Sequence, residues 1–321
     1  MKILITGAAG FVGKNLTVAL QNIIDGKDRT HPELLIDKLW LYDVDTSRDV
    51  LEEACQNCDF VFNLAGVNRP QNAEEFMQGN FGFASELLDT LKKYKNTCPV
   101  VLSSSIQATL VGRYDSDYGR SKKAGEELFF DYSKETGAKV LVYRFPNIFG
   151  KWCRPNYNSA VATFCHNIAN DLPITVNDRA VQLELLYIDD LISEMICALE
   201  GKEHHCDFEG INTVFAENGK YCAATVTHKV TLGEIVDLLD KFSAQPRTLV
   251  MPEIPENSFA KKLYCIEADM EFPSSLEAAE FAGLKSRSSI FEHLAGRKSY
   301  AGRHPETGEP LHWMKLEDKI S

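Results

Sequence analysis

A glycine-rich turn directly after the first apolar segment constrains this chain more than any other feature. Residues 2–6 read Lys-Ile-Leu-Ile-Thr, and residues 6–13 read Thr-Gly-Ala-Ala-Gly-Phe-Val-Gly. Apolar residues then recur at helical spacing from Phe11 to Leu20. A strand, a tight turn and a helix in this order are typical of the first unit of a sheet that binds phosphate groups at its edge.

Each glycine of this turn has a distinct expected role. Gly7 permits the turn, Gly10 lets the backbone approach a pyrophosphate, and Gly13 lets the helix pack closely on the strand. Phe11 and Val12 supply amides at the start of the helix, where phosphate charge is stabilised. We therefore predict dinucleotide contacts from these five residues. An ordinary glycine turn is the alternative, and the strand before it and the helix after it argue against that reading.

The rest of the first half alternates apolar strands with helical segments. Further strands are expected at residues 38–42, 59–64, 99–102 and 140–144, with a helix from Phe83 to Lys93. This alternation predicts an α/β fold, a Rossmann-like, doubly wound parallel sheet with a smaller substrate-binding portion. We assign residues 1–245 to this domain. Residues 246–321 are expected to form a divergent tail of short helices, around 275–284 and 288–294, or to be partly disordered.

Asp43 follows the second strand and is a candidate for binding the adenosine ribose. A carboxylate there can accept hydrogen bonds from both ribose hydroxyls, which favours NAD(H) over NADP(H). Asp45 competes for this role, and Arg48 or Arg29 could neutralise a 2′-phosphate. Both cofactors therefore stay open.

The third strand runs into Leu64, Ala65 and Gly66. The last two of these residues are small, which lets the backbone come close to the cofactor. Residues 67–70 then begin an exposed loop. Asn80, near the start of the next helix, is expected either to hydrogen-bond backbone near the site or to cap the helix.

Tyr118 and Lys122 are the candidate catalytic pair. They are four residues apart and project from one face of a helix, so the ammonium can lie beside the phenol, stabilise its anion and lower its pKa. Such a tyrosine can pass a proton to or from a sugar or alcohol oxygen. The run Ser103, Ser104 and Ser105 ends the fourth strand, and one of its hydroxyls is expected to hold the substrate oxygen.

Composition excludes several classes of function. The formal charge of −12 argues against nucleic-acid binding by bulk electrostatics. No apolar stretch is long enough to span a membrane, so we expect a cytoplasmic protein. Nine cysteines at scattered spacings do not suggest a disulfide framework, and reduced thiols are the expected state. The histidines show no repeated ligand spacing, so no metal site is predicted.

The motifs together resemble the extended short-chain dehydrogenase/reductase superfamily, in particular its NAD-dependent epimerase/dehydratase branch. The matching strings are TGAAGFVG, LAG, SSS, YGRSK, RFPNIFG and YIDD, in that order. The longer strings LAGVNRP, LSSSIQAT and FGKWCRPNYNSAVATFC resemble the reductase domains of CapF-type capsular-polysaccharide enzymes. The zinc-binding cupin domain of that type has no counterpart after Tyr264, where His293, His304 and His312 do not reproduce its metal motif.

This resemblance implies reduction of the C4 ketone of a UDP-2-acetamido-2,6-dideoxy-hexos-4-ulose, on the way to UDP-N-acetyl-L-fucosamine. It places the proton relay at Tyr118, its lysine at Lys122 and the orienting hydroxyl at Ser105. It also implies a homodimer. Expected substrate contacts are Ser104, Asn147, Lys151, Arg154, Asn158 and Arg179. Lys151 and Arg154 are candidates for binding the diphosphate, and Trp152 or Tyr157 for stacking on a ring.

Two alternatives stay open beside the reductase. Dehydration is disfavoured, because Ile106 and Gln107 follow Ser105 where dehydratases carry an acidic pair. A nucleotide-sugar epimerase that keeps bound NAD needs only the tyrosine and the nicotinamide. A non-catalytic dinucleotide-binding protein is the alternative from a different class.

Overall fold

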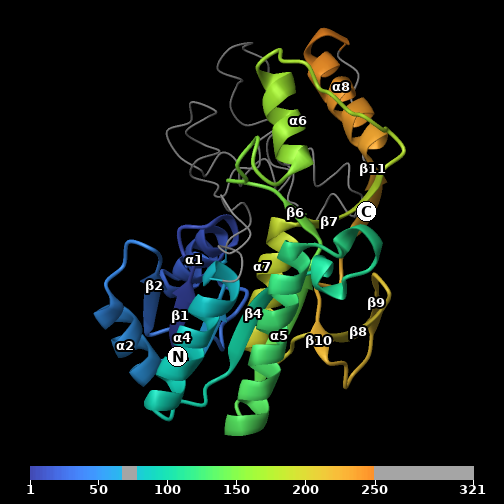
Figure 1. Ribbon diagram of the computed structural model, residues 1–321. Coiled ribbons are helices and arrows are strands. Elements are labelled where there is room, and N and C mark those ends of the chain that lie inside the picture. The colour runs from blue at the N-terminus through green and yellow to red at the C-terminus, as the bar shows by residue number, and fades with distance from the viewer. Residues whose placement is uncertain (67–77, 249–321) are drawn as a thin grey trace, which may run out of the picture. The chain divides into compact units, whose positions relative to one another are not determined.

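The computed structural model describes residues 1–66 and 78–248 (Figure 1). The expected loop at 67–70, the expected helices at 275–284 and 288–294, and the three histidines after Tyr264 lie outside the described residues. The last described helix, α8 (Leu232–Thr248), continues past the boundary expected at residue 245.

The main sheet has eight strands in the order β2-β1-β3-β4-β5-β10-β8-β9. Five of them are the predicted strands, and β10 extends the same parallel arrangement from β5. β8 and β9 then run antiparallel at the far edge. The bounds are β1 (Lys2–Thr6), β2 (Lys38–Tyr42), β3 (Phe60–Asn63), β4 (Val100–Ser105), β5 (Val140–Phe145), β8 (His205–Glu209), β9 (Asn212–Phe215) and β10 (Tyr221–Cys222).

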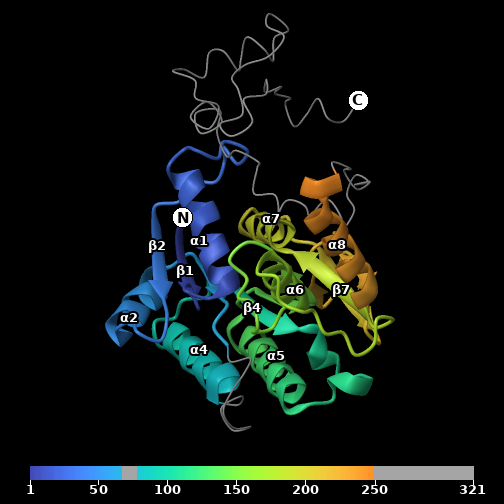
Figure 2. The same ribbon diagram turned by 90° about the horizontal axis from the view of Figure 1, so that it is seen from above.

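Helices cover both faces of this sheet, which confirms the doubly wound architecture. Figure 2 shows α1 (Phe11–Ile24) and α7 (Ile188–Leu199) together on one face. The other face carries α2 (Arg48–Asn57), α4 (Phe83–Lys93) and α5 (Asp117–Thr136). All four residues of β3 and all six of β4 are buried, as expected for central strands between two helical layers.

A smaller portion lies beyond the carboxyl ends of the parallel strands. Its sheet has the order β11-β7-β6, formed by β6 (Asn147–Phe149), β7 (Gln182–Tyr187) and β11 (His228–Thr231). The helices α6 (Ala160–Ala169) and α8 pack against each other there (Figure 1). Three short turns complete the described chain: the π-helical η1 (Gln78–Gly82) and the 3₁₀ turns η2 (Ile106–Thr109) and η3 (Gly112–Tyr114).

The fourth strand is longer than its apolar run. We expected the strand to end at Leu102, with the serines following it, but the serines continue the ladder. Ser103, Ser104 and Ser105 face Tyr143, Arg144 and Phe145 of β5. Pairing with β5 therefore extends the strand into a polar sequence, and it fixes the face to which each hydroxyl points.

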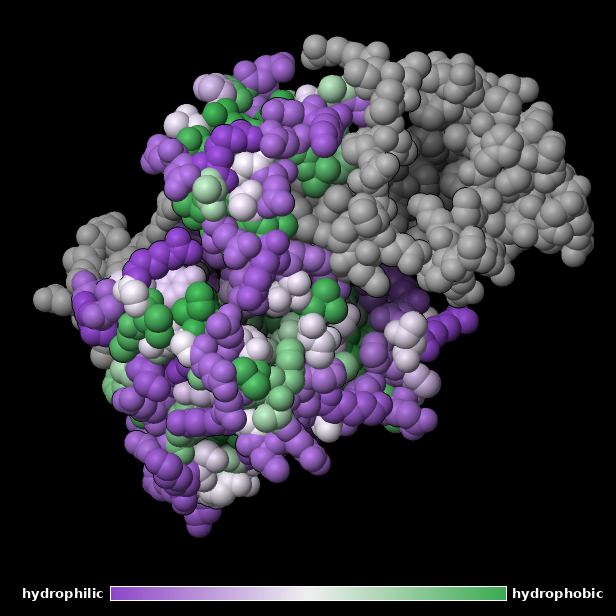
Figure 3. Space-filling view, turned by 90° about the vertical axis from the view of Figure 1, so that its right-hand side faces the viewer, coloured by the Kyte–Doolittle hydropathy of each residue, from purple (hydrophilic) through white to green (hydrophobic). Residues whose placement is uncertain are grey.

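The described surface seen in Figure 3 is mostly hydrophilic, with separate hydrophobic patches. Scattered exposed apolar side chains of this kind are ordinary for a folded protein. Among the described residues, no helix has the length and hydrophobicity needed to cross a bilayer.

Candidate active site

The glycine turn forms a cradle that side chains would fill. Gly7 has a φ of +68°, and a Cβ there would lie 2.7 Å from the backbone nitrogen of Ala65. A Cβ on Gly13 would lie 2.2 Å from the Gly7 carbonyl oxygen. Both distances are far inside van der Waals contact, so only glycine fits. The turn therefore packs directly against Ala65, between the half-buried Leu64 and the exposed Gly66. Gly10, Phe11 and Val12 complete the start of α1.

Asp43 lies at the end of β2 beside this cradle. Its Oδ2 accepts a hydrogen bond from the Ala9 amide at 2.8 Å, and its Oδ1 accepts one from the Val44 amide at 2.9 Å. The alternative cations have other partners, since Arg48 pairs with Glu86 at 3.0 Å and Arg29 donates to the Gly26 carbonyl at 3.2 Å. The glycine cradle and an adjacent carboxylate fit a dinucleotide, with phosphates at the helix start and ribose hydroxyls at Asp43.

Ser105 and Tyr118 are brought near each other by β4 and α5. Ser116 begins α5 by accepting a hydrogen bond from the Gly119 amide at 3.0 Å, which places Tyr118 in the first turn. The Ser105 side chain lies near enough to the Tyr118 phenol to lower its pKa. Two of the three predicted catalytic groups thus meet at the carboxyl end of the central strand.

Lys122 lies one turn further along α5. Its side chain is 8% exposed, and its Nζ donates to the Ser103 carbonyl at 3.1 Å. The same Nζ lies 5.8 Å from the centroid of the Tyr118 ring. The ammonium is therefore buried beneath the tyrosine and anchored to β4.

Burial dominates the protonation of this pair. It raises the pKa of Tyr118 to about 12; the hydrogen bond from Ser105 opposes this rise, and nearby Tyr157 adds to it. Burial likewise lowers the pKa of Lys122 to about 8, against the attraction of Glu126. The expectation that the lysine lowers the tyrosine pKa is wrong for this structure, because desolvation of the phenol outweighs any help from the ammonium.

Ser104 does not face the site, which corrects its assignment as a substrate contact. It is 4% exposed and donates to Glu126 Oε1 at 2.6 Å. Strand alternation sends its side chain to the face opposite those of Ser103 and Ser105. Glu126 also accepts from Arg144 Nε at 2.8 Å and Nη2 at 2.7 Å, and Arg144 donates to the Tyr221 hydroxyl at 2.8 Å.

Sequence reasoning missed this buried ion pair behind the catalytic helix. The spacing of these residues could have indicated that Glu126 is buried. Glu126 lies four residues after Lys122 and eight after Tyr118, on the same helix face. An acid at that position has to face the sheet, where Arg144 of β5 is its partner.

Asn80 connects η1 to the catalytic helix. Its Nδ2 donates to Ser121 Oγ at 3.1 Å. A Cβ on Gly66 would lie 2.7 Å from Asn80 Oδ1 and 3.1 Å from Lys122 Nζ. The end of β3, Asn80 and Lys122 therefore meet closely, and Asn80 has a larger part in shaping the site than a helix cap would require.

The segment after β6 reaches the catalytic tyrosine. Tyr157 lies near enough to influence the pKa of Tyr118, and the Arg154 guanidinium lies 5.7 Å from the Tyr157 ring centroid. Trp152 and Asn156 have φ values of 65° and 56°, in a region of backbone conformation that residues other than glycine rarely adopt. Such backbone strain is common in segments that bind ligands.

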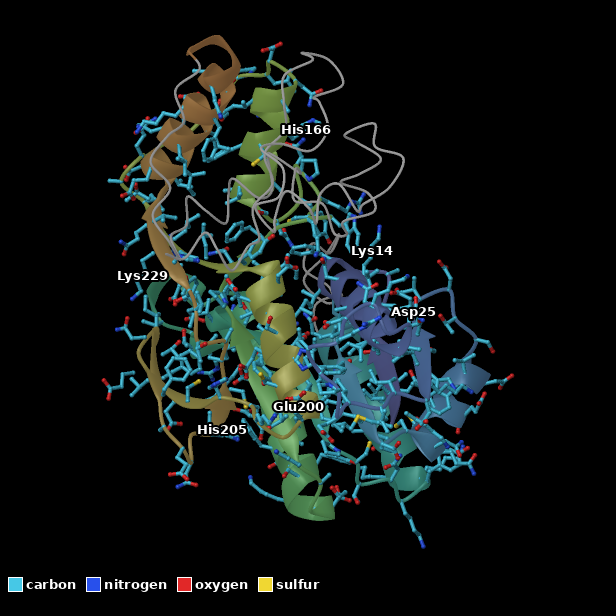
Figure 4. All side chains as sticks on the ribbon, turned by 180° about the vertical axis from the view of Figure 1, so that it is seen from behind. Lys14, Asp25, His166, Glu200, His205 and Lys229 are labelled. Atoms are coloured by element: carbon cyan, nitrogen blue, oxygen red, sulfur yellow. The ribbon has the colours of Figure 1, made fainter. Side chains whose placement is uncertain are left out.

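The start of this segment is docked on α1. Asn15 Nδ2 donates to the Lys151 carbonyl at 3.2 Å, and the Lys14 ammonium lies 4.8 Å from the Trp152 ring centroid. Lys151 Nζ pairs with Asp189 in the first turn of α7 at 2.9 Å. The predicted cation is thus held at the junction of the two helices. Figure 4 labels Lys14 on α1.

The other predicted substrate contacts are more dispersed. The Arg179 guanidinium is held on α8, where it donates to Asp237 at 2.5 Å and to the Gly233 carbonyl at 3.2 Å. Asn147 is exposed at the start of β6, and Asn158 is exposed near the start of α6. The structure brings Tyr157 to the catalytic pair, whereas Arg179 is fixed to a helix of the smaller portion.

The histidines of the described chain have local partners. His204 Nδ1 is 2.6 Å from Glu194 Oε2, and His205 Nδ1 is 3.1 Å from the Gly219 carbonyl oxygen. Figure 4 shows His166 and His205 on separate elements, α6 and β8. Within residues 1–66 and 78–248, no group of three or more potential metal ligands comes together.

Fold and site define an α/β protein with a glycine cradle that fits a dinucleotide, a serine at the end of β4, and a tyrosine and a lysine on α5. The chain belongs to the NAD dependent epimerase/dehydratase family, whose model matches residues 3–209.

Two relatives are similar over most of the chain, one compared by sequence and one by sequence and structure. The UDP-2-acetamido-2,6-beta-L-arabino-hexul-4-ose reductase of Pseudomonas aeruginosa is 35% identical over 254 residues, 79% of this chain and 61% of the relative. The chain therefore spans about three fifths of that relative. The capsular polysaccharide assembling protein CapF of Staphylococcus aureus is 41% identical, with a TM-score of 0.68 over 85% of this chain and 68% of CapF.

A more distant structure shows the shared fold alone. The UDP-glucuronic acid 4-epimerase of Bacillus cereus, in complex with NAD, is 19% identical. Its TM-score is 0.58 over 85% of this chain and all of the epimerase.

Proposed function

We propose that this chain reduces the C4 ketone of a UDP-2-acetamido-2,6-dideoxy-hexos-4-ulose with NADH or NADPH, in the synthesis of a UDP-N-acetyl-L-fucosamine-type precursor of surface polysaccharide. The observation that carries the proposal is the clustering of three side chains: Ser105 lies near Tyr118, and the buried Lys122 Nζ lies 5.8 Å from the Tyr118 ring centroid. The reductase name of the Pseudomonas relative supports the choice of substrate.

The three side chains divide the proton chemistry between them. The nicotinamide, when bound, supplies the hydride. Ser105 orients the substrate oxygen, and Tyr118 gives its phenolic proton to that oxygen as negative charge develops there. Lys122 stabilises the phenolate that results. Because the pKa of Tyr118 is about 12, the phenol holds its proton at neutral pH, which suits the direction of reduction.

The residues after Ser105 argue against dehydration. Ser105 begins η2 by accepting a hydrogen bond from the Gln107 amide at 3.2 Å, and Ile106 and Gln107 form the start of that turn. Neither side chain can protonate a leaving hydroxyl or remove a proton from carbon at neutral pH. Reduction needs no such acid and base.

We assign the UDP portion to the segment after β6 and to nearby polar residues. Lys151 and Arg154 are proposed to bind the diphosphate, and Asn147 and Asn158 to bind the sugar. Arg179 would reach the diphosphate only after leaving Asp237, so its contribution is expected to be smaller. A homodimer is part of the proposal, and sedimentation of the purified chain would test it.

The direct test mixes the purified protein with the UDP-4-keto-6-deoxy-N-acetylhexosamine and either NADH or NADPH. Stoichiometric loss of the reduced-cofactor absorbance, with a C4 alcohol as product, would support the reductase and rank the cofactors. Asp43, bonded to the cradle, favours NADH in that ranking. Isomerisation of the sugar without net oxidation would instead identify an epimerase. Cofactor binding without turnover would favour the non-catalytic alternative.

Tyr118→Phe tests the proton relay itself. Loss of the phenolic proton should lower kcat by about 10²–10⁴-fold while the dinucleotide still binds. Steady-state kinetics and cofactor fluorescence titration measure the two properties separately. Wild-type turnover in this variant would refute the assignment.

A further inference from the structure

Two cysteines face each other at the amino ends of the strands that carry the site. Cys58 ends α2 just before β3, and Cys98 lies just before β4. The strands β3 and β4 pair directly with each other, and Val61 lies opposite Val100. The two Sγ atoms are 3.7 Å apart and are joined by a thiol hydrogen bond.

One asparagine ties the backbones of both cysteines together. Asn96 Nδ2 donates to the Cys58 carbonyl at 2.9 Å, and Asn96 Oδ1 accepts from the Cys98 amide at 3.0 Å. Tyr132 of α5 donates to the Asn96 carbonyl at 3.2 Å. This amide fixes both backbones, and the sulfurs have to approach by less than about 2 Å to reach the bonding distance of about 2.05 Å.

We propose that Cys58 and Cys98 form a reversible disulfide when the protein meets a small-molecule disulfide such as oxidised glutathione. The Cys98 thiolate attacks one glutathione sulfur and releases the first glutathione. The Cys58 thiolate then attacks the Cys98 sulfur of the mixed disulfide and releases the second. The two protein thiols lose two electrons and two protons, and one glutathione disulfide becomes two glutathione thiols.

Exposure sets this order of attack. Cys98 is partly exposed, whereas Cys58 is 4% exposed. The hydrogen bond with Cys58, followed by burial, raises the pKa of Cys98. Since the thiolate is the attacking form, the reaction should be slow at neutral pH and faster at alkaline pH. Cys55, on the last turns of α2, is fully buried, which protects it from the oxidant.

The disulfide would lie at the edge of the sheet opposite the catalytic residues. Ser105 lies seven positions after Cys98 along β4 and the residues before it, roughly 23 Å at strand spacing. The cross-link should therefore leave kcat unchanged. It would close a loop with a sequence separation of 40 residues, which restricts the unfolded chain and should raise the Tm by several degrees.

The experiment uses the full chain, reduced and freed of reductant, then incubated with oxidised glutathione at pH 7 and pH 8.5. Remaining thiols are alkylated, and peptides are mapped by mass spectrometry without reduction. Cys58→Ser and Cys98→Ser are compared with Cys197→Ser, a cysteine of intermediate exposure on α7.

We expect a 58–98 cross-linked peptide in the wild type and in Cys197→Ser, forming faster at pH 8.5. Dithiothreitol should remove both the cross-link and the rise in Tm. Cys58→Ser should instead accumulate a glutathione adduct at Cys98. Glutathione adducts at Cys153 or Cys197 without a 58–98 peptide, or a cross-link that persists in Cys98→Ser, would overturn the proposal.

Discussion

Three consecutive serines on β4 have three different partners. The Ser103 carbonyl accepts from Lys122, the Ser104 hydroxyl donates to Glu126, and the Ser105 side chain lies near Tyr118. The sequence places all three at the carboxyl end of a parallel strand, where ligands bind. It does not separate them, because their faces depend on where the ladder with β5 ends.

Ser105→Ala and Ser104→Ala form a matched pair that separates orientation from structure. Ser105→Ala should lower kcat by about 10²-fold, as for the loss of one oriented hydrogen-bond donor. Ser104→Ala should keep kcat within a few-fold but lower the free energy of unfolding by about 1–3 kcal/mol, since Glu126 loses a buried donor. Kinetics and urea titration measure the two effects. Equal losses of kcat would return Ser104 to the substrate site.

The buried lysine predicts a pH limit for the reduction. The pKa of Lys122 is about 8, so the ammonium beneath Tyr118 is present below that pH and is lost above it. The value of kcat/KM should therefore be flat at lower pH and fall above about pH 8. A pH–rate profile checks this. In Lys122→Arg, where the cation does not titrate, any residual activity should lack the fall; an unchanged profile would assign the limit to another group.

At the scale of elements, α5 is fixed to the sheet by a buried ion pair. Glu126 is fully buried and is bound by Arg144 of β5, whose guanidinium lies 4.0 Å from the Tyr221 ring centroid of β10. In the sequence Glu126 stands beside Glu127 and reads as half of an exposed acidic pair. Only the packing of α5 on β4 and β5 shows which of the two glutamates is buried.

Replacing one partner of this ion pair should destabilise the fold more than replacing both partners with apolar residues. Glu126→Leu or Arg144→Met alone leaves a buried charge without its partner and should lower the free energy of unfolding by about 3–5 kcal/mol. The double variant should lose less than the sum of the two. Urea titrations of all four proteins complete the cycle. Additive losses would show that the pair does not act as a unit.

At the scale of the whole molecule, the five strands β1 to β5 were predictable, whereas β8, β9 and β10 were not. The predicted bounds of β1 and β2 match the structure, because short apolar runs between turn residues specify buried parallel strands. β8 and β9 have mixed polar sequences and mostly accessible side chains, and β10 has two residues. Their strand conformation comes from pairing with neighbours, which no local pattern reveals.

The strand β10 is only two residues long, which affects how easily the β8–β9 hairpin opens. It is the strand that pairs with both β5 and β8, through Tyr221 and Cys222, and Cys206 is the one fully buried hydrophobic residue of the strands β8 and β9. Local opening of the hairpin exposes little apolar surface and so costs little free energy. In hydrogen–deuterium exchange, the amides of β8 and β9 should therefore exchange well before those of β1, β3, β4 and β5. Equal protection would mean that all eight strands open together. Unequal protection would mean that the sheet can lose its outer edge while the strands bearing Ser105 and the glycine cradle stay closed.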